Sequence, residues 1–377
     1  MSLTFPSPPL DVALAPGSPV DEERVRVRVD QALGRFLDRQ EAVLAAISPE
    51  LGPVAAAVRD LVRGGKRLRP AFCYWGWRGA GGGTGDSATD ESAIAACAAL
   101  ELLQAGALVH DDLMDRSDTR RGLPSVHRRF EAEHARRGWR GDPAQYGAAS
   151  AVLLGDLLLA WCDELLGDCG LPPAAIRRAK PLFDLMRTEV MAGQYLELLE
   201  PAAPRAEGSL ERARTVIHFK SAKYTVERPL QTGGLLAAAA PALTSAYAAF
   251  GLPLGEAFQL RDDLLGVYGD PARTGKPTGD DLREGKRTVL IAETLAHCTA
   301  ADARLLDDLL GAPGLEEPGV ALLRGVITRS GAPERVEARI DRLLREALTA
   351  LDAAPLVDPE ARRVLRRLAD AATTRQR

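Results

Sequence analysis

The segment HDDLMDRSDTRRG, residues 110–122, concentrates charged side chains, with the acids first and the bases after them. Asp111, Asp112 and Asp115 precede Arg120 and Arg121. In a helix, residues four positions apart share a face, so Asp111 and Asp115 would point the same way and repel each other. Such a pair needs a counter-charge, and Mg²⁺ usually binds proteins through one or two carboxylates together with substrate phosphates. For this segment alone, a magnesium–phosphate site and a solvated acidic turn are both open.

A second acidic turn favours the magnesium interpretation. The segment FQLRDDLLGVYGD, residues 258–270, follows an apolar helical pattern and contains Asp262 and Asp263, with Gln259 one turn earlier. Two carboxylate turns on separate buried helices can face each other across a cavity. Together they would hold several Mg²⁺ ions around one diphosphate.

Basic residues beside glycine, proline or the acids match the same ligand. They lie in GGKRLRP at 64–70, at Arg120 and Arg121, at Lys220, and at Lys276 and Lys286. Arginine offers forked donors to phosphate oxygens, and lysine offers a mobile point charge. The GKPTGDD stretch at 275–281 lacks the full phosphate-loop pattern and follows no predicted strand, so we reject a nucleotide-binding loop there.

The elements that must position these residues are helices. Val25, Val29 and Leu33 recur at helical spacing, and alternating patterns typical of strands are nearly absent. Residues 92–109 are apolar nearly all round, which is typical of a helix inside a large bundle. This helix leads directly into the first acidic turn, so the aspartates are expected where a buried helix reaches a cavity or the surface.

The expected organisation is one all-α domain, a single large helical bundle of ten or more helices over residues 21–377. Residues 1–20 are rich in proline and small residues and are expected to lack fixed structure. Loops are predicted near 79–92, 136–147 and 200–209, and each only separates one helical pattern from the next.

Composition excludes several classes of function. With 377 residues and 46% hydrophobic residues, the chain has ample material for a globular core. A formal net charge of −4 gives no broad basic field for nucleic acid, so no nucleic-acid partner is expected. The five cysteines have no metal-binding spacing, and their odd number does not suggest a disulfide framework. Neither a secretory signal nor a membrane-spanning segment is predicted, so we expect a cytoplasmic protein.

With these motifs, the sequence resembles the trans-isoprenyl diphosphate synthases, also called the polyprenyl synthetase family. The landmarks GGKRLRP, HDDLMDRSDTRRG, FKSAKYT, FQLRDDLLG and GKPTGDDLREGKRT occur in family order, over residues from about 60 to 290. The resemblance implies an all-α fold around a deep central cavity, usually in a homodimer. It also implies Mg²⁺-dependent head-to-tail condensation of isopentenyl diphosphate with an allylic diphosphate, with three Mg²⁺ ions expected per active site.

The resemblance also assigns roles to individual residues. The magnesium ligands implied are Asp111, Asp112 and Asp115 in the first motif, and Asp262 and Asp263 in the second. The positions that would face the allylic diphosphate are Arg120, Lys220, Ser221, Gln259, Lys276 and Lys286. Those that would bind isopentenyl diphosphate are Lys66, Arg69, Gln104 and Arg121.

Two positions depart from the family pattern. Gln104 stands where the family often has histidine; glutamine can still donate a hydrogen bond to phosphate but carries no charge. Gly266 stands where a third aspartate is common in the second motif, which puts the second metal site in doubt, although Asp263 and Asp270 leave carboxylates in reach.

Two other functions share parts of this pattern. A terpene cyclase uses the same ionisation of an allylic diphosphate but generally needs no isopentenyl site, so GGKRLRP argues against it. A non-catalytic partner subunit of a heteromeric synthase typically loses one or both acidic motifs, and only Gly266 points that way. The synthase is the favoured interpretation.

Product length depends on the helix that precedes Asp111. One helical turn is about 5.4 Å, comparable to one isoprene unit. Gly106 and Ala107, one turn back, leave space, while Leu103, two turns back, is large enough to obstruct a longer chain. We therefore predict geranylgeranyl diphosphate, with twenty carbons, as the main product, and longer or shorter chains as the alternative. Another interpretation is that Gly106 and Ala107 only permit close helix packing.

Overall fold

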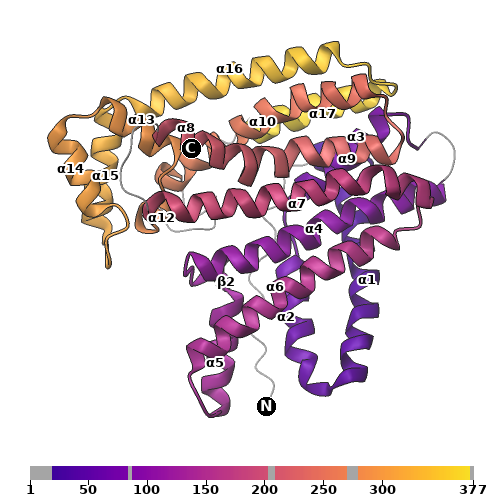
Figure 1. Cartoon of the computed structure of the whole chain (residues 1–377), viewed down its shortest axis with the longest axis horizontal. Helices are drawn as coiled ribbons and strands as arrows, with labels where there is room; N and C mark the ends of the chain where they lie inside the picture. Colours follow the sequence, from indigo (N-terminus) through magenta and orange to yellow (C-terminus); the bar gives the residue numbers. More distant parts are fainter. Residues whose placement is uncertain (1–18, 84–86, 203–208, 270–278, 374–377) are drawn as a thin grey trace.

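The computed structural model describes residues 19–83, 87–202, 209–269 and 279–373, and its fold is all-α, as predicted (Figure 1). The first half of the described chain forms η1 (Pro19–Arg24), α1 (Val25–Ile47), η2 (Pro49–Leu51), α2 (Gly52–Val62), α3 (Leu68–Gly79), α4 (Ser87–Met114), β1 (Thr119–Arg120), β2 (Leu123–Pro124), α5 (Val126–Arg137), α6 (Pro143–Gly167) and α7 (Pro173–Ala202). The second half forms α8 (Ser209–Val216), η3 (Ile217–Glu227), α9 (Arg228–Leu236), α10 (Pro241–Tyr268), α12 (Asp280–Arg283), α13 (Val289–His297), α14 (Ala300–Leu309), α15 (Glu317–Arg329), α16 (Ala332–Ala353) and α17 (Pro359–Thr373). Among the described residues, β1 and β2 pair as a two-residue antiparallel ladder.

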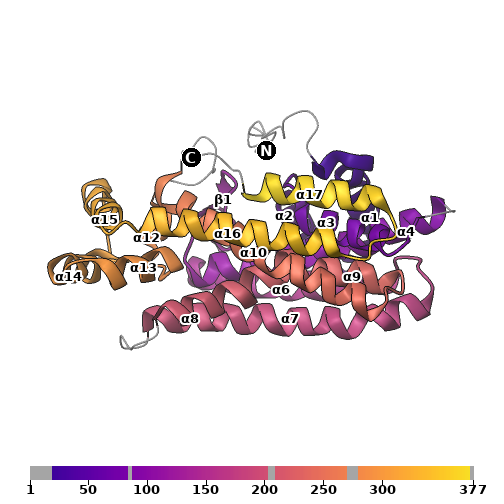
Figure 2. The ribbon, with the colours of Figure 1, turned by 90° about the horizontal axis from the view of Figure 1, so that it is seen from above.

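The long helices pack side by side in a thick bundle. α4 packs most extensively against α6, α3 against α9, and α10 against α16 and η3. Figure 2 shows α7 along one outer face of the bundle and α17 on the opposite side. In both views α14 and α15 form a projection at one end of the molecule.

Helix α4 lies at the centre of this arrangement because it is apolar on nearly all sides. Its buried residues include Ile94, Cys97, Leu100 and Leu102. By length and composition alone α4 is long and apolar enough to cross a membrane, but 72% of its most apolar window is buried inside the protein, as in the core helix of a globular fold. The burial of α4 therefore provides a rigid support for the aspartates at its carboxyl end.

The buried apolar side chains of the described residues form two clusters. The larger one surrounds α4 and includes Phe36, Trp75 and Phe250. The smaller one lies where α13 to α16 meet the second half of α10, around Leu260 and Val326. Because α10 and α16 contribute to both clusters, they form a continuous link between them. The single domain over residues 21–377 stays a prediction.

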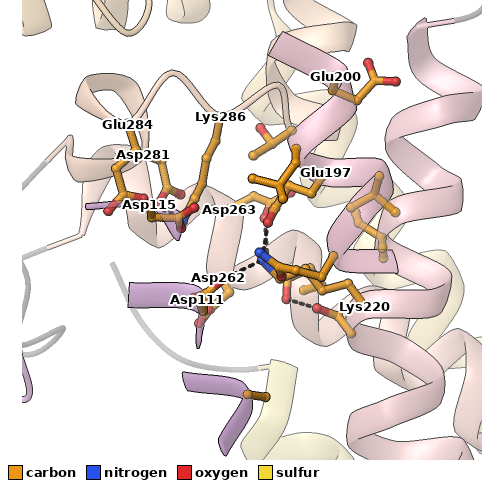
Figure 3. Close-up of a pocket in the computed structure, with 18 of the residues that line it drawn as sticks. Asp111, Asp115, Glu197, Glu200, Lys220, Asp262, Asp263, Asp281, Glu284 and Lys286 are labelled. Atoms are coloured by element: carbon orange, nitrogen blue, oxygen red, sulfur yellow. Dashed lines mark hydrogen bonds and ion pairs between the residues drawn. The ribbon is translucent and has the colours of Figure 1, made fainter. Parts of the chain in front are cut away.

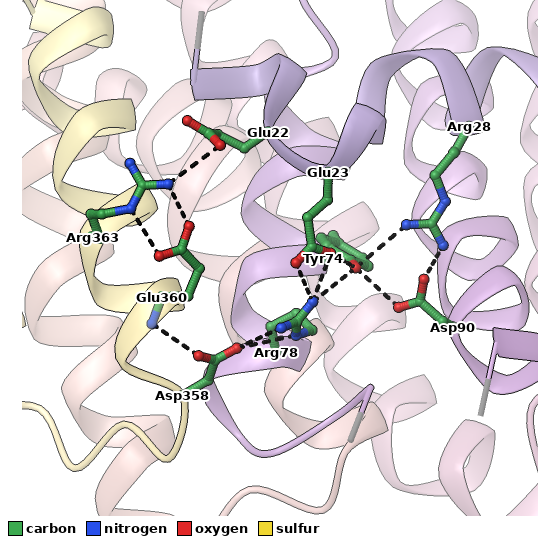
Figure 4. Close-up of polar contacts among 9 residues, drawn as sticks. All are labelled: Glu22, Glu23, Arg28, Tyr74, Arg78, Asp90, Asp358, Glu360 and Arg363. Carbon is green, nitrogen blue, oxygen red and sulfur yellow. Dashed lines mark hydrogen bonds and ion pairs between the residues drawn. The ribbon is translucent and has the colours of Figure 1, made fainter. Parts of the chain in front are cut away.

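A group of polar side chains ties the start of the described chain to its end (Figure 4). Arg78 of α3 pairs with Glu23 of η1 at 2.6 Å and with Asp358, just before α17, at 2.8 Å. The Tyr74 hydroxyl lies 2.5 Å from Glu23 Oε2 and 3.0 Å from Asp90 Oδ1 of α4. These contacts join η1, α3, α4 and the start of α17.

The loops differ from the sequence-based expectations mainly at their ends. α4 begins at Ser87, so the predicted loop at 79–92 is six residues too long at that end. The loop predicted at 136–147 covers only residues 138–142. Charged side chains in a first or last helical turn weaken the apolar pattern without stopping the helix, which explains both errors. The N-terminal segment expected to lack fixed structure was predicted two residues too long, because Pro19 and Val20 belong to η1. In the loop predicted at 200–209, residues 200–202 belong to α7 and residue 209 to α8. Residues 1–18 and 203–208 lie outside the described residues.

Candidate active site

The two acidic turns meet at one pocket of about 300 Å³ (Figure 3). Asp111 and Asp115 reach it from the end of α4, and Asp262 and Asp263 reach it from α10. The fold thus brings together the two acidic turns that the sequence analysis paired, although they lie about 150 residues apart in the sequence.

Lys220 crosses the pocket between two carboxylates. Its Nζ lies 3.0 Å from Asp111 Oδ1 and also contacts Glu197 of α7. Burial disfavours the charge on Asp111, but Lys220 and then Lys286 outweigh it, so the pKa of Asp111 lies below its ordinary value. Burial likewise opposes the charge on Lys220, whose pKa is nevertheless raised by Asp111 and Glu197.

Asp115 lies in a different electrostatic environment from Asp111. It pairs with Lys286, whose Nζ lies 3.4 Å from Asp115 Oδ2. Lys286 is shared with Glu284 at 2.6 Å and Asp281 at 3.9 Å, so Asp115 receives only part of its charge. Burial and then the charge of Asp111 raise the pKa of Asp115 to about 6. The site therefore holds more negative charge than its bases neutralise.

Asp112, unlike Asp111 and Asp115, is not among the lining residues of the pocket. Its side chain is buried, and Arg120 Nε donates to Asp112 Oδ1 over 2.9 Å. Arg120 Nη2 also lies 3.7 Å from Asp111 Oδ2 and lines the pocket. Asp112 thus holds Arg120 beside the first acidic turn.

The FKSAKYT motif lies in η3, an eleven-residue π-helix, a form that is rare and is often found at functional sites. Its neighbours approach very closely. A Cβ at Gly193 of α7 would lie 2.5 Å from the backbone nitrogen of Lys220, and one at Gly255 of α10 would lie 2.5 Å from Ala222 Cα. The two glycines therefore let α7 and α10 hold η3 between them, with Lys220 and Ser221 on the pocket.

Ser221, Gln259 and Asp263 form a hydrogen-bonded chain across the pocket. Ser221 Oγ donates to Gln259 Oε1 over 2.5 Å, and Gln259 Nε2 donates to Asp263 Oδ1 over 2.9 Å. The other carboxylate oxygen of Asp263 is buried without a hydrogen-bond partner, and burial raises the pKa of Asp263 well above its ordinary value. An unpartnered buried carboxylate oxygen is costly unless a cation or proton reaches it.

The donor set fits Mg²⁺ bound together with a diphosphate. Among the described lining residues, eight carboxyl groups stand against five basic side chains. In the part of the chain that the structure describes, no three acidic, histidine or cysteine side chains are arranged to hold a metal ion by themselves. Mg²⁺ typically completes its oxygen shell with water and substrate phosphates, which suits this arrangement.

Two of the residues expected to bind isopentenyl diphosphate, Arg69 and Gln104, line the same pocket. The Tyr224 hydroxyl donates to Gln104 Oε1 over 2.8 Å, which leaves the Gln104 amide nitrogen to donate elsewhere. The Arg69 guanidinium lies 4.3 Å from the centre of the Tyr224 ring, and Arg69 Nη2 donates to Thr225 Oγ1 over 2.8 Å. The π-helix therefore positions both residues.

Lys66 and Arg121 are not among the lining residues of this pocket. Lys66 is exposed in the turn before α3. Arg121 lies against the same turn, with Nη1 donating to the carbonyl oxygen of Arg63 over 3.3 Å. Between Lys66 and Arg69, the side chain of Arg67 is buried and pairs with Glu101 at 2.6 Å, which anchors the turn.

The residues considered for product length are placed differently from one another. Ala107 lines the pocket, whereas Gly106 faces α6, where a Cβ would lie 3.1 Å from the Gly155 carbonyl oxygen. Leu103 is buried and does not line the pocket. Lys276, expected near the allylic diphosphate, and Asp270 lie outside the described residues.

Sequence reasoning missed several residues of the pocket. Glu197 and Gln194 stand alone on the long helix α7, where no acidic or basic cluster marks them. Asp281 and Glu284 belong to the quoted GKPTGDDLREGKRT segment, and their spacing before Lys286 was an available indication. The lysines of that segment are the residues whose charge matches a diphosphate, so the pattern alone did not single out these two acids.

Comparison with known proteins identifies the family. A family model described as polyprenyl synthetase matches residues 53–321, more than half of the chain. The chain belongs to the polyprenyl synthetase family. It is a trans-prenyl diphosphate synthase, a transferase, and prenyltransferases of this family depend on Mg²⁺.

Relatives of this synthase are named for different product lengths. It is 30% identical over 318 residues to the geranylfarnesyl diphosphate synthase of Aeropyrum pernix, covering 84% of this chain and 92% of the relative. It is 33% identical over 307 residues to the (2E,6E)-farnesyl diphosphate synthase of Mycobacterium bovis, covering 78% and 77%. The crystal structure of the Corynebacterium glutamicum geranylgeranyl pyrophosphate synthase, complexed with isoprenyl diphosphate and magnesium, superposes with a TM-score of 0.88 at 41% identity, covering 95% and 99%.

Proposed function

We propose that this synthase condenses isopentenyl diphosphate with a dimethylallyl, geranyl or farnesyl diphosphate and releases geranylgeranyl diphosphate as its main product. The observation that carries the proposal is the position of Ala107. It lines the pocket one helical turn before Asp111 and leaves room for an allylic tail beneath the acidic turn. Large side chains lie deeper along α4, where Leu103 fills the core two turns back.

The proposed site divides into three groups of residues. Three Mg²⁺ ions are bound by the aspartates of the two acidic turns, which are Asp111, Asp112, Asp115, Asp262 and Asp263. The three aspartates of the first turn act as one unit with Arg120. Arg120, Lys220, Ser221, Gln259, Lys276 and Lys286 face the allylic diphosphate. Lys66, Arg69, Gln104 and Arg121 bind isopentenyl diphosphate. The support for this division is the lining of the pocket. Except for Asp112, all described residues of the Mg²⁺ group and of the allylic group line it, and so do Arg69 and Gln104 of the isopentenyl group.

Catalysis in this proposal is electrostatic. Breaking the carbon–oxygen bond places negative charge on the departing diphosphate, and bound Mg²⁺ would neutralise part of it. Lys220, Arg120 and Lys286 already carry positive charge beside Asp111 and Asp115, so they lie where a leaving diphosphate would need donors. The apolar wall of the pocket, with Ala107, keeps water from the allylic cation.

The test of product length is chromatography of dephosphorylated products from the wild type and from an Ala107→Val, Ala107→Leu and Ala107→Phe series. We expect twenty carbons from the wild type and progressively shorter products as the side chain grows. Circular dichroism and melting curves of each variant control for folding. A wild-type product of fifteen or twenty-five carbons, or a product length that ignores the size of residue 107, would contradict the proposal.

The proposal also covers the assembly. We infer a homodimer of single-domain chains, acting in the cytoplasm. Its support is an apolar surface on α6 and α7, formed by Val152, Leu153, Leu185, Met191, Tyr195, Leu198 and Leu199. Large apolar side chains exposed in this number on two paired helices are typical of an interaction site.

A further inference from the structure

Gly266 lacks the side chain that would be the third carboxylate of the second acidic turn. The carboxylate of another residue, Asp281, lies in the space that this side chain would occupy. A Cβ at Gly266 would lie 1.9 Å from Asp281 Oδ2 and 2.5 Å from Asp281 Cγ. Real Cβ atoms do not approach other atoms so closely, so Asp281 could not keep this position beside any other residue at 266. The Asp281 carboxylate occupies the space of the missing side chain.

The position of Asp281 is fixed by the backbone around it. The Gly279 N–H donates to the Gly266 carbonyl oxygen over 3.1 Å, which docks the start of α12 on the end of α10. The Lys286 N–H donates to the Asp281 carbonyl oxygen over 3.0 Å, and the Leu282 side chain is buried beneath. The backbone therefore places residue 281 beside Gly266, and the Asp281 side chain makes the contact itself.

The same carboxylate faces the pocket. Asp281 lines it, and its side chain is 16% exposed (Figure 3). Lys286 Nζ lies 3.9 Å from Asp281 Oδ1 and 3.4 Å from Asp115 Oδ2, so one lysine joins Asp281 to the first acidic turn. Asp263, with a buried oxygen that has no hydrogen-bond partner, lines the same pocket.

We propose that Asp281 supplies, from α12, the third carboxylate of the second Mg²⁺–diphosphate cluster, and that Gly266 is needed because it leaves room for that carboxylate. This inference rests on the proposed function of the pocket. Under this proposal, the same carboxylate can be supplied either from position 266 or from position 281. A sequence motif confined to α10 does not reveal this, because position 281 lies in α12.

The first experiment measures Mg²⁺-dependent binding of inorganic diphosphate by isothermal titration calorimetry, with no turnover involved. Asp281→Ala and the isosteric Asp281→Asn should each weaken binding roughly tenfold or more, the size typical of losing an outer carboxylate at a metal site. Asp280→Ala, which removes the neighbouring charge at the same helix start, is the matched control and should bind as the wild type does. If Asp281→Asn binds as tightly as Asp280→Ala, the proposal is overturned.

The second experiment is a swap. Gly266→Asp alone should displace the Asp281 carboxylate and weaken binding, whereas Gly266→Asp combined with Asp281→Ala should recover most of the wild-type affinity. The distances explain this, because the three Asp281 atoms nearest a Cβ at 266 are all in the carboxylate. Equal losses from Gly266→Asp in both backgrounds would overturn the proposal.

The two experiments also separate this inference from the function on which it rests. A wild type that binds no Mg²⁺–diphosphate would overturn both. Normal wild-type binding with no coupling between positions 266 and 281 would overturn only the role of Asp281.

Discussion

Asp111 and Asp115 lie one helical turn apart on α4, yet their pKa values move in opposite directions. Lys220 contacts Asp111 directly, whereas Lys286 divides its charge among Asp115, Asp281 and other acids. Asp111 is therefore held as an anion, while burial and the charge of Asp111 raise the pKa of Asp115 to about 6. The pKa values of these two aspartates of one helical turn thus differ, because their charged partners come from other parts of the fold.

The first prediction concerns the acids themselves. Asp111→Ala and Asp262→Ala should each lower kcat by about a hundredfold or more, because each removes one of the few carboxylates that can hold a cation against the diphosphate. Steady-state condensation assays under saturating Mg²⁺ would measure the loss, with melting curves near the wild type. Asp118→Ala removes an exposed acid from the segment between α4 and β1 and should leave kcat unchanged. Near-normal turnover in both site variants would mean that the acidic turns do not bind the metal.

The second prediction concerns Tyr224, which holds both Gln104 and Arg69. Tyr224→Phe removes the hydroxyl that fixes the Gln104 amide, so the KM for isopentenyl diphosphate should rise several-fold while the KM for the allylic diphosphate stays nearly constant. Kinetics with each substrate varied in turn would measure both constants.

Tyr247→Phe is the matched control for Tyr224→Phe. The Tyr247 hydroxyl is also buried and donates to the Gly76 carbonyl oxygen over 2.8 Å, but it lies outside the pocket. Its loss should cost about 1 kcal/mol of stability and alter neither KM. A uniform rise in both KM values for Tyr224→Phe would show that the two diphosphate subsites are misassigned.

At the scale of elements, the sequence predicted the helices well because their apolar period depends only on one buried face. The pairing of the two acidic turns was also predictable, since each follows a buried helix. The π-helix η3 was not, because its wide turn depends on the close approach of Gly193 and Gly255 from two other helices. Glu197 and Asp281 were missed for the same reason: each reaches the pocket through the packing of its helix, not through a local pattern.

The third prediction concerns Glu256, which joins three of these elements. Its carboxylate lies 3.1 Å from His218 Nε2 of η3, contacts Arg339 of α16, and lies 4.0 Å from Arg214 Nε of α8. Burial opposes the charge, but the hydrogen bonds from His218 and Arg339 lower the pKa of Glu256 to about 2. The folded state thus favours the anion, so this stabilisation is complete above about pH 4.5 and is lost as the pH falls towards 2.

Glu256→Gln should therefore destabilise the protein by ~2–3 kcal/mol at pH 7 and by clearly less near pH 3. Urea unfolding at the two pH values would measure the difference. Glu346→Gln changes an exposed residue of α16 and should have little effect at either pH. A loss in Glu256→Gln that is the same at both pH values would show that packing, and not the charge, makes the contribution.

At the scale of the whole molecule, the outer face of α6 and α7 is the feature that a single chain leaves unexplained. Lys180 of α7 pairs with Asp163 of α6 at 3.4 Å, which holds the two helices together. Leu153 is 70% exposed and Tyr195 is 66% exposed on this face. Leu198 is exposed on the same helix and also lines the pocket, so whatever covers the face also borders the candidate active site.

The last prediction is that this face is the interface of a homodimer. Leu153→Glu and Tyr195→Glu each place a charge in an apolar contact that the symmetry of a dimer would bury twice, so either variant should dissociate into monomers. Sedimentation velocity at micromolar concentrations would report the mass. Leu322→Glu, on α15, alters a residue that is 54% exposed outside this face and should leave the dimer intact. Turnover should fall with dissociation, because Leu198 beside the pocket would lose the partner that covers it. A monomeric wild type would rule this interface out. Dimers of Leu153→Glu and Tyr195→Glu that are as stable as the wild-type dimer would rule it out as well.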